Sequence, residues 1–373
     1  MINYRELTEC VACGGSDLAT VLNLGRQPLA NNFTATPTWQ ETFPLVLKQC
    51  ASCTHLQLSV SVDPTVLFRR YIYRSGTSTT LREYSVQFAK TLTDQHGTGT
   101  VLDVACNDGT QLDALRQHGW ATFGVDPAEN LALYNTHPKR VSFFDESCRD
   151  LGDFDVIVAQ NVVAHTPDPL TLLTVARDLA PVMYVQTSQA HMVERNEFDT
   201  IYHEHISFFS PQSMRALAER AGWVLTGYTI TDIHGGSFVF TLERDGEPCD
   251  TPGAGDTARF ARNAKKIIRE LRAVIDETPN LVGYGAAAKA MTVLNAVGAG
   301  PRYIVDDAPE KAHTFTPGLG IPVLPSSVLA DEPNEIALLP LAWNFHDEIS
   351  SRVQAIYGKP FETLRYFPAV EWA

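Results

Sequence analysis

The 373-residue chain lacks the surplus of basic residues on which a general nucleic-acid binder depends. It has 29 lysine and arginine residues against 43 aspartate and glutamate residues, which gives a formal net charge of −14. Because nucleic-acid affinity rests largely on the neutralisation of phosphates, we expect no nucleic-acid partner. The deficit leaves room for a small phosphorylated ligand, which needs only a local pocket of donors.

Long apolar runs are also missing. No stretch of about eighteen apolar residues occurs, and the first nine residues do not pair a basic segment with an apolar one. We therefore expect a cytoplasmic protein with no membrane partner. A chain of this length exceeds one ordinary hydrophobic core, so two or three domains are expected. No heptad seam or repeat indicates the oligomeric state, which stays open.

Cysteine is scarce and unevenly placed. Four of the seven cysteines, namely Cys10, Cys13, Cys50 and Cys53, form two Cys-x-x-Cys pairs, and the other three stand alone. In a cytoplasmic chain two such pairs favour a structural zinc ion held by four thiolates. Redox-active dithiols are the weaker alternative. A catalytic zinc is disfavoured, because four thiolates leave no position for water.

The first glycine-containing turn lacks the Gly-x-Gly-x-x-Gly pattern of dinucleotide-binding proteins. Residues 100–104 predict a buried strand that is followed by a turn over residues 105–109, a helix over residues 110–118 and a second strand that ends at Asp126. This order predicts the start of a doubly wound α/β sheet, in which ligands bind beyond the carboxyl ends of the strands.

Two carboxylates mark the ligand edge of this predicted sheet. Asp126 follows Asp103 by twenty-three residues, close to the spacing at which a carboxylate binds ribose hydroxyls. Ala105 and Asn107 occupy positions where a dinucleotide site would have glycines, so the turn looks more like that of a methyl-donor site. A dinucleotide remains the alternative ligand.

Two other segments are expected near the same edge. A strand over residues 154–159 is followed by polar residues that include Asn161 and His165, which are placed to face the ligand. The linker from Tyr71 to Ser78, with Tyr73 and Ser75, is aromatic and then rich in hydroxyl groups. It is either a solvated loop or a lid over a polar ligand.

From about Pro252 the chain repeats the strand, glycine turn and helix order. The repeated turn contains Gly283, Tyr284 and Gly285, with Lys289 at the start of the helix. A helix N-terminus beside a lysine favours an anion. We expect this turn to serve a phosphate-bearing substrate, with an ordinary packed turn as the alternative.

The sequence Tyr202-His203-Glu204-His205 brings a phenol, two imidazoles and a carboxylate into four residues. Imidazole titrates near neutral pH and therefore suits proton abstraction. The alternatives are a zinc site and a hydrogen-bonded core cluster. On a strand the two histidines would share one face, whereas a helical zinc pair is spaced by four residues.

Six ordered landmarks support a resemblance to a known family. They are the paired Cys-x-x-Cys module with residues 27–33, the 75–78 lid, the 104–109 turn, the 197–205 stretch, the 283–289 turn and the 341–349 stretch. Together they resemble the sugar C-methyltransferases of deoxysugar biosynthesis, which methylate carbon 3 of nucleotide-activated 4-keto-6-deoxy sugars. The resemblance implies an α/β chain with a zinc-binding module over residues 1–65, a class I methyltransferase domain over residues 66–250 and a Rossmann-like substrate domain over residues 251–373.

The resemblance also implies the cofactor and the roles of individual residues. His205 would be the general base that forms an enolate next to the ketone, and Glu204 would orient its imidazole. Tyr202 would assist in binding or in stabilising the oxyanion, His165 would be a second imidazole beside the sugar, and His203 would have a structural role. The residues expected to bind S-adenosylmethionine (SAM) are Ser75, Asp103, Ala105, Asn107, Gly109, Asp126 and Asn161. Those expected to bind the nucleotide sugar are Tyr73, Gly283, Tyr284, Gly285, Lys289 and Asn344.

Ala105 departs from the family pattern, which has glycine at this position. The alanine is tolerable if its backbone angles are ordinary, but its methyl group would crowd a donor lying directly over it. Two other functions stay open at this point. One is a methyltransferase of the same architecture that acts on oxygen or nitrogen of another phosphorylated or nucleoside-linked molecule. The other is a non-catalytic, zinc-containing binding protein.

Overall fold

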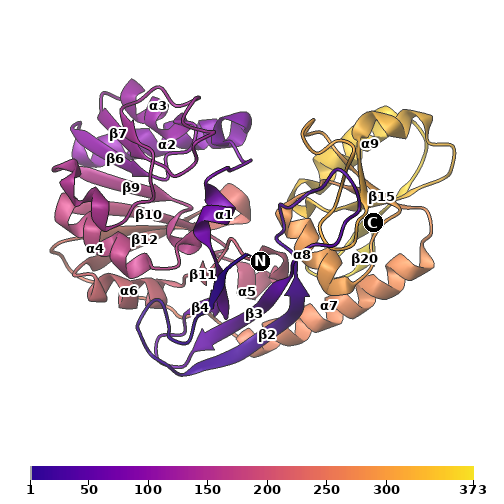
Figure 1. The fold of residues 1–373 in the computed structure, drawn as a ribbon, viewed down its shortest axis with the longest axis horizontal. Coiled ribbons are helices and arrows are strands. Elements are labelled where there is room, and N and C mark those ends of the chain that lie inside the picture. The colour runs from indigo at the N-terminus through magenta and orange to yellow at the C-terminus, as the bar shows by residue number, and fades with distance from the viewer. Residues whose placement is uncertain (1) are drawn as a thin grey trace.

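Two seven-stranded sheets and a four-stranded sheet organise the chain in the computed structural model, which describes residues 2–373 (Figure 1). The central and C-terminal domains each contain one large sheet, and the smaller sheet of the N-terminal module lies between these two lobes. The predicted α/β fold with a cysteine-containing module, a doubly wound domain and a Rossmann-like domain is confirmed.

The central sheet has the order β12-β13-β10-β9-β6-β7-β8. Its strands are β6 (Thr100–Val104), β7 (Ala121–Val125), β8 (Lys139–Arg140), β9 (Val156–Gln160), β10 (Val182–Ser188), β12 (Val224–Thr231) and β13 (Ser237–Glu243). The chain moves outward from β6 to β8 and then returns to β9 on the other side of β6. The carboxyl ends of β6 and β9 therefore form a topological switch point, where doubly wound sheets bind ligands.

Helices cover both faces of this sheet. They are α2 (Thr79–His96), α3 (Thr110–Gln117), α4 (Pro169–Leu179) and α6 (Pro211–Arg220). The parallel strands β6 and β9 are almost wholly buried, as expected for strands with helices on both sides.

The sheet of the N-terminal module has the order β11-β4-β3-β2. It consists of β2 (Leu18–Gln27), β3 (Phe43–Cys50), β4 (Leu56–Leu58) and β11 (Ser207–Phe208), while β1 (Tyr4–Glu6) pairs separately with β5 (Val60–Val62), which leads into α1 (Pro64–Phe68). The domain boundaries near residues 65 and 250 stay a prediction. The module takes its strand β11 from far beyond the first of them.

The C-terminal sheet has the order β16-β17-β15-β14-β18-β19-β20. Its strands are β14 (Leu281–Tyr284), β15 (Tyr303–Asp306), β16 (Thr314–Phe315), β17 (Pro322–Pro325), β18 (Ala337–Pro340), β19 (Glu362–Arg365) and β20 (Glu371–Trp372), and its helices are α8 (Ala288–Val297) and α9 (His346–Tyr357). The inner five strands are parallel.

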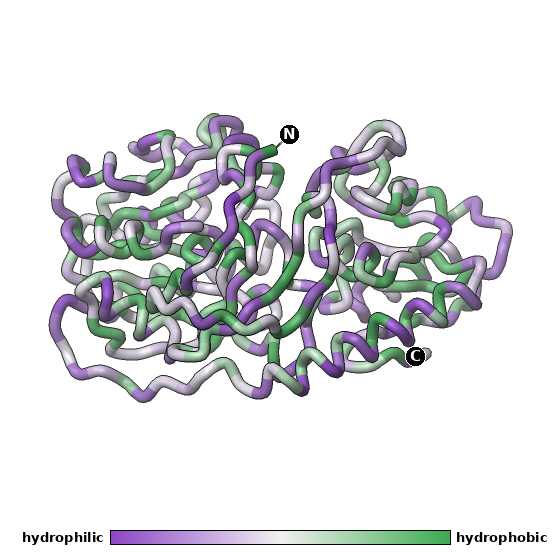
Figure 2. The backbone as a smooth tube through the Cα atoms, turned by 60° about the horizontal axis from the view of Figure 1, so that its bottom comes forward, coloured by the Kyte–Doolittle hydropathy of each residue, from purple (hydrophilic) through white to green (hydrophobic). Residues whose placement is uncertain are grey.

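One long helix, α7 (Thr257–Glu277), leads into the C-terminal domain. Its buried residues Phe260, Ala264, Ile267, Leu271 and Ile275 recur every three or four positions. Such spacing puts them on one face of the helix. Figure 2 shows the alternation as purple and green bands along the helix. The apolar face joins a core that also contains leucines of β2 and β3, so the N-terminal module and the C-terminal domain share buried contacts.

Within residues 2–373, none of the helices combines the length and the apolar character that a membrane crossing requires.

We expect Gly283→Ala to destabilise the protein. A methyl group at this position in β14 would lie 2.9 Å from Leu341 Cδ1 and 3.0 Å from Ile304 Cγ1. Overpacking of this kind costs about 1–3 kcal/mol. Thermal and urea unfolding measure the effect. Gly227→Ala in β12 is the matched control, since its methyl group would meet nothing within 4 Å. Equal stability of the two variants would contradict the steric argument.

Candidate active site

A cavity of about 590 Å³ lies at the carboxyl ends of β6, β7, β9 and β10. Side chains from the central sheet, the 64–85 linker, the tyrosine-histidine segment and the C-terminal domain line it together. Of the residues expected in the site, the lining includes Tyr73, Ser75, Asp103, Ala105, Asn107, Asp126, Asn161, His165, Tyr202, His205 and Lys289. The fold therefore brings together groups that lie more than two hundred residues apart in the chain.

Two carboxylates lie at the ends of neighbouring strands in this cavity: Asp103 is buried in β6, and the half-buried Asp126 follows β7. Asp126 accepts hydrogen bonds from the backbone nitrogens of Asn107 at 2.8 Å and Ala128 at 2.7 Å. Burial and the nearby Asp126 raise the pKa of Asp103 well above its usual range. A cationic amino group would relieve that cost, and the fixed Asp126 suits ribose hydroxyls. These residues fit SAM.

Four non-glycine residues that line the cavity have left-handed backbone angles. The φ values are 62° for Ala105, 50° for Asn107, 54° for Asn161 and 57° for His234. The condition set for Ala105, ordinary backbone angles, is therefore not met. A left-handed alanine costs about 1–2 kcal/mol, and such strain gathers at functional sites.

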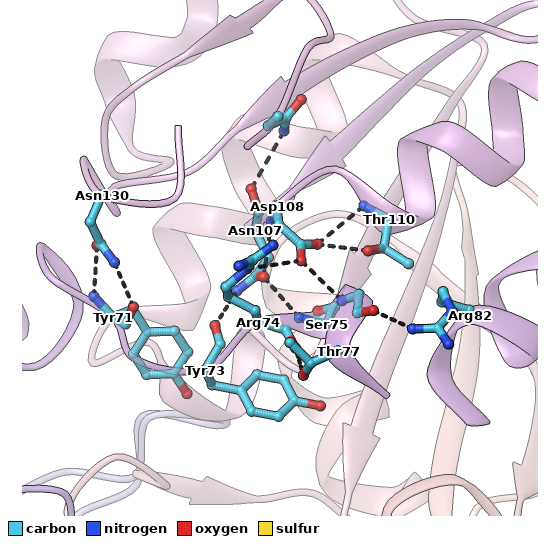
Figure 3. Close-up of polar contacts among 12 residues, drawn as sticks. Tyr71, Tyr73, Arg74, Ser75, Thr77, Arg82, Asn107, Asp108, Thr110 and Asn130 are labelled. Atoms are coloured by element: carbon cyan, nitrogen blue, oxygen red, sulfur yellow. Dashed lines mark hydrogen bonds and ion pairs between the residues drawn. The ribbon is translucent and has the colours of Figure 1, made fainter. Parts of the chain in front are cut away.

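The linker after α1 is tied to the cofactor turn (Figure 3). Asn107 accepts from the Ser75 backbone nitrogen at 3.1 Å and donates to the Tyr73 carbonyl at 3.1 Å. Asn130 makes the same kind of reciprocal pair with the Tyr71 backbone, at 3.0 and 2.8 Å. The segment is thus an ordered strap over one wall of the cavity, which favours the lid interpretation over a solvated loop.

Four buried polar atoms in the lining have no hydrogen-bond partner among the described residues. They are Gln111 Oε1, Gln160 Nε2, Asn161 Oδ1 and His165 Nδ1. Buried polar groups are normally satisfied, so these atoms mark places where a ligand would bind. Gly109 lies elsewhere: a methyl group on it would meet the Asn135 side chain at 2.9 Å, and it does not line the cavity.

The tyrosine-histidine cluster forms a turn, not the extended segment considered for it. The His205 backbone nitrogen donates to the Tyr202 carbonyl at 2.9 Å, and β11 begins only at Ser207. This turn sends the two histidines in different directions. His203 packs edge-on to Phe43, with ring centroids 5.7 Å apart, and bonds the Pro44 carbonyl at 3.3 Å, so it lies away from the cavity.

His205 is held in one tautomer by its neighbours. Its Nδ1 lies 2.7 Å from the Thr200 carbonyl, which can only accept, so Nδ1 carries the proton. Its Nε2 then has a free lone pair, which lies 3.0 Å from the Tyr202 hydroxyl. Burial, together with the nearby His165, holds the pKa of His205 well below its usual range. The ring is therefore neutral at neutral pH.

Glu204 does not orient the imidazole as expected. Its carboxylate accepts from Asn31 Nδ2 at 2.6 Å, and the Thr200 carbonyl takes the orienting position on His205. The reason is the turn, which points Glu204 toward the N-terminal module. Burial raises the pKa of Glu204 to about 7.

His165 is the second imidazole in the cavity. It follows β9 in the short helix η3 (Val163–His165), and its ring centroid lies 4.9 Å from that of His205. Burial lowers its pKa to about 4.

Lys289 lines the cavity, but the other residues of the 283–289 turn that were expected to bind the substrate do not. Gly283 packs inside β14, and the Tyr284 hydroxyl donates to Asp307 Oδ2 at 2.7 Å within its own domain. Gly285, with φ 94°, faces Ala342. Asn344 lies beside a separate hollow of about 470 Å³. Strand packing, and not ligand contact, accounts for the two glycines.

Several residues that shape the site were not predicted from the sequence. They are Asn31, Gln189, Thr200 and His234. Asn31 and Thr200 belong to stretches that were recognised as landmarks, yet nothing in the sequence tells that Asn31 will bond Glu204 and that Thr200 will bond His205. His234 precedes two glycines, and that was the available signal for it.

The four paired cysteines converge on one point. Their sulfur atoms all lie within 4.8 Å of one another, with Cys10 and Cys53 3.6 Å apart and Cys13 and Cys50 3.5 Å apart. Tetrahedral coordination at about 2.3 Å from zinc requires sulfur separations of about 3.8 Å. The donor set therefore fits structural zinc. Arg220 of α6 fastens this cluster to the central domain by donating to the Ala12 carbonyl at 2.8 Å.

Family models match three consecutive parts of the chain. They describe a zinc binding domain over residues 10–68, a methyltransferase domain over residues 74–227 and a C-methyltransferase C-terminal domain over residues 255–368.

Individual proteins match as well. The C-methyltransferase NovU of Streptomyces niveus is 28% identical over 386 residues and covers 92% of both chains. A ubiquinone biosynthesis O-methyltransferase of Coxiella burnetii is 25% identical over 170 residues, which cover 39% of this chain and 72% of that protein. The crystal structure of the magnesium protoporphyrin IX methyltransferase ChlM from Synechocystis PCC 6803 with bound SAM matches 44% of this chain and 79% of its own. The sequence identity there is 14% and the TM-score 0.34, and nothing about the site rests on this match.

The central domain and its cavity define a class I methyltransferase that uses SAM. The chain combines this domain with an N-terminal zinc-binding domain and a C-terminal C-methyltransferase domain, which makes it a SAM-dependent C-methyltransferase. It is therefore an enzyme, and the non-catalytic alternative is wrong.

We expect Cys53→Ser to lose the metal. Wild-type protein should contain one zinc ion per chain by elemental analysis, and the variant substantially less, with a lower unfolding midpoint because the ion clamps two distant segments. Cys249→Ser is the control, since Cys249 is half-buried and outside the cluster. Full zinc content in Cys53→Ser would contradict four-thiolate coordination.

We expect Glu197→Gln to change how stability depends on pH. Burial raises the pKa of Glu197 from 4.5 to about 7. The folded protein therefore retains a proton that the unfolded chain loses above about pH 4.5, so this group makes stability fall as pH rises from 4.5 to 7. The variant should gain on the order of 2 kcal/mol relative to wild type between pH 5 and pH 7.5.

Urea unfolding at both pH values measures this difference. Exposed Glu335→Gln is the control and should show no such change. A constant difference between Glu197→Gln and wild type across this range would refute the raised pKa.

Proposed function

We propose that this enzyme methylates the carbon next to the keto group of a nucleotide-activated 4-keto-6-deoxy sugar, with His205 as the base. The observation that carries the proposal is the fixed tautomer of His205, whose unprotonated Nε2 faces the cavity beside the Tyr202 hydroxyl. The substrate class comes from the resemblance of the six landmarks to sugar C-methyltransferases.

The chemistry begins with the transfer of a proton from the sugar carbon to His205 Nε2. The keto group makes that carbon acidic enough for an imidazole base, because the electron pair left behind delocalises onto the keto oxygen as an enolate. The imidazolium that forms is stabilised through its Nδ1–H by the Thr200 carbonyl, 2.7 Å away.

Tyr202 suits the stabilisation of the enolate oxygen. Its hydroxyl bonds His205 in the free enzyme, and a bound sugar would release it to donate to the keto oxygen instead. Burial raises its pKa well above the usual range, so the phenol keeps the proton it donates.

Asp103 and Asp126 would hold the amino acid and ribose parts of SAM, and bound SAM supplies an electrophilic methyl group to the enolate carbon. Lys289 is the one lysine or arginine among the described cavity-lining residues, and it suits the phosphate end of the substrate. The methyl group would replace one hydrogen of the sugar carbon, with S-adenosylhomocysteine as the leaving group. The proton taken up by His205 then passes to solvent, which balances the reaction.

Deuterium exchange tests the proposal directly. With dTDP-4-keto-6-deoxyglucose in D₂O, the wild-type enzyme should exchange the proton next to the ketone without SAM, and should add one methyl group to that carbon with SAM. His205→Asn should lower both rates by about 10²–10⁴-fold, because general-base catalysis contributes about that much.

Two further measurements separate chemistry from folding. His205→Asn should bind S-adenosylhomocysteine as wild type does, since the ring lies apart from the Asp103 and Asp126 carboxylates. Tyr202→Phe should slow exchange less than His205→Asn, because it retains the base. Product with the methyl group on oxygen, or unimpaired exchange by His205→Asn, would defeat the proposal.

A further inference from the structure

His234 is an imidazole in the cavity that the mechanism above does not use. It belongs to the short helix η5 (Ile233–Gly235), in the turn between β12 and β13. Strand β13 begins beside the end of β10, where Ser237 pairs with Ser188. Since Gln186 and Ser188 of β10 line the cavity, the turn stands at the same carboxyl-terminal edge as the cofactor and the base.

The backbone of this turn is strained and firmly tied. His234 has φ 57° and is followed by Gly235 at 86° and Gly236 at 126°. A side chain at Gly236 is impossible without movement, because its Cβ would lie 2.5 Å from the His191 ring. A left-handed histidine costs about 1–2 kcal/mol, and residues held so are found where function requires their position.

Three bonds hold the turn in place from different directions. The Gly236 carbonyl accepts from the Ala190 nitrogen at 3.1 Å, the Gly235 carbonyl from Arg195 at 3.3 Å, and the Ile233 carbonyl from the Ser237 hydroxyl at 2.9 Å. The backbone is therefore anchored on both sides of His234, while the imidazole itself is free.

His234 is an exposed residue, part of which lines the cavity, and its imidazole makes no hydrogen bond to any residue of the described chain. Its neighbours in the lining include His165, His205 and Lys289. Protein surroundings and the positive charge of Lys289 keep the pKa of His234 below the usual range for histidine. The group is thus a neutral imidazole at the cavity wall, on a backbone that is fixed in advance.

We propose that His234 is a further catalytic residue, whose neutral imidazole donates a hydrogen bond to the sugar oxygen that gains negative charge as His205 removes the proton. This inference rests on the proposed function. A neutral imidazole suits this task because it polarises a carbonyl without surrendering its proton, and a donor fixed before the reaction costs no reorganisation. Together with Tyr202 it would give the enolate oxygen two donors.

Two substitutions at this position separate the turn from the imidazole. His234→Gly keeps the left-handed backbone and removes the donor, whereas His234→Gln keeps a donor at about the reach of Nε2. His234→Gly should lower the turnover number for methyl transfer and the SAM-independent deuterium exchange by about 10²–10³-fold, the usual effect of removing one oxyanion donor. His234→Gln should recover part of both.

The structural alternative has its own readouts. The KM for the nucleotide sugar, the dissociation constant for S-adenosylhomocysteine and the unfolding midpoint should stay near wild type in His234→Gly. The matched control is His313→Gly: His313 is also left-handed, with φ 61°, and also exposed, but it lies in the C-terminal domain and does not line the cavity, so this variant should retain full activity.

The outcomes are distinct. Absence of exchange by the wild-type enzyme would remove the proposed function and the inference with it. If wild type exchanges deuterium and the exchange rate of His234→Gly is within threefold of the wild-type rate, the role of His234 is overturned while the proposed function stands. Loss of cofactor affinity in His234→Gly in proportion to its activity would assign His234 to positioning of the fold and likewise overturn the proposal.

Discussion

The hydrogen bond between His205 Nδ1 and the Thr200 carbonyl is the interaction on which the proposed chemistry depends, and it exists only where all three parts of the chain meet. The segment that contains both residues is held by β11 against β4 of the N-terminal module. On the central domain, the Ile206 nitrogen donates to the Ala164 carbonyl at 2.9 Å. On the C-terminal domain, Trp343 donates to Asp199 at 2.8 Å. A change in any of these contacts would move the base relative to the cofactor strands, so the N-terminal module helps to position the base even though its cysteines do not line the cavity.

Burial imposes a common electrostatic character on the site. It lowers the pKa values of His165 and His205 and raises those of Asp103, Glu204 and Tyr202, so every one of these groups is shifted toward its neutral form. Shifts of this kind gather at functional sites. A cavity of neutral donors and acceptors exerts little screening, so the fixed charge of Lys289 and a bound cation would act strongly on the proton transfer.

The fold could be predicted because each domain has a recognisable local sequence pattern. Buried strands alternate with glycine turns and helices, and the cysteine pairs have a spacing that few other sites use. The lining of the cavity was predicted where a residue follows a central strand, as with Asp103, Asp126, Asn161 and His165. The prediction of the lining failed where tertiary packing determines the position of a side chain. Alternation along a strand could not reveal that residues 202–205 form a turn, which sends Glu204 to Asn31 instead of to the base. Gly283 and Tyr284 have the local pattern of a ligand turn, yet their packing against Leu341 and Asp307 faces the core of their own domain. His234 lies at the cavity because β13 pairs with β10, and no short sequence motif predicts that pairing.

The two large domains contain the same kind of turn, but the turn of the central domain is suited to bind a ligand and that of the C-terminal domain is a structural support. In the central domain Asp126 accepts from the nitrogens of Asn107 and Ala128, and in the C-terminal domain Asp306 accepts from those of Ala286 at 2.6 Å and Ala308 at 2.8 Å. The strand-to-turn bonds also correspond, from Ala105 to Val125 and from Gly285 to Val305. The difference is Lys311, whose ammonium donates to the Ala286 carbonyl at 2.8 Å and lies 3.7 Å from Asp306. That charge neutralises the second carboxylate from within the chain, whereas no lysine or arginine among the described residues lines the cavity beside Asp126. The first turn therefore keeps its affinity for a ligand, and the second becomes a rigid support that presents Lys289 to the shared cavity.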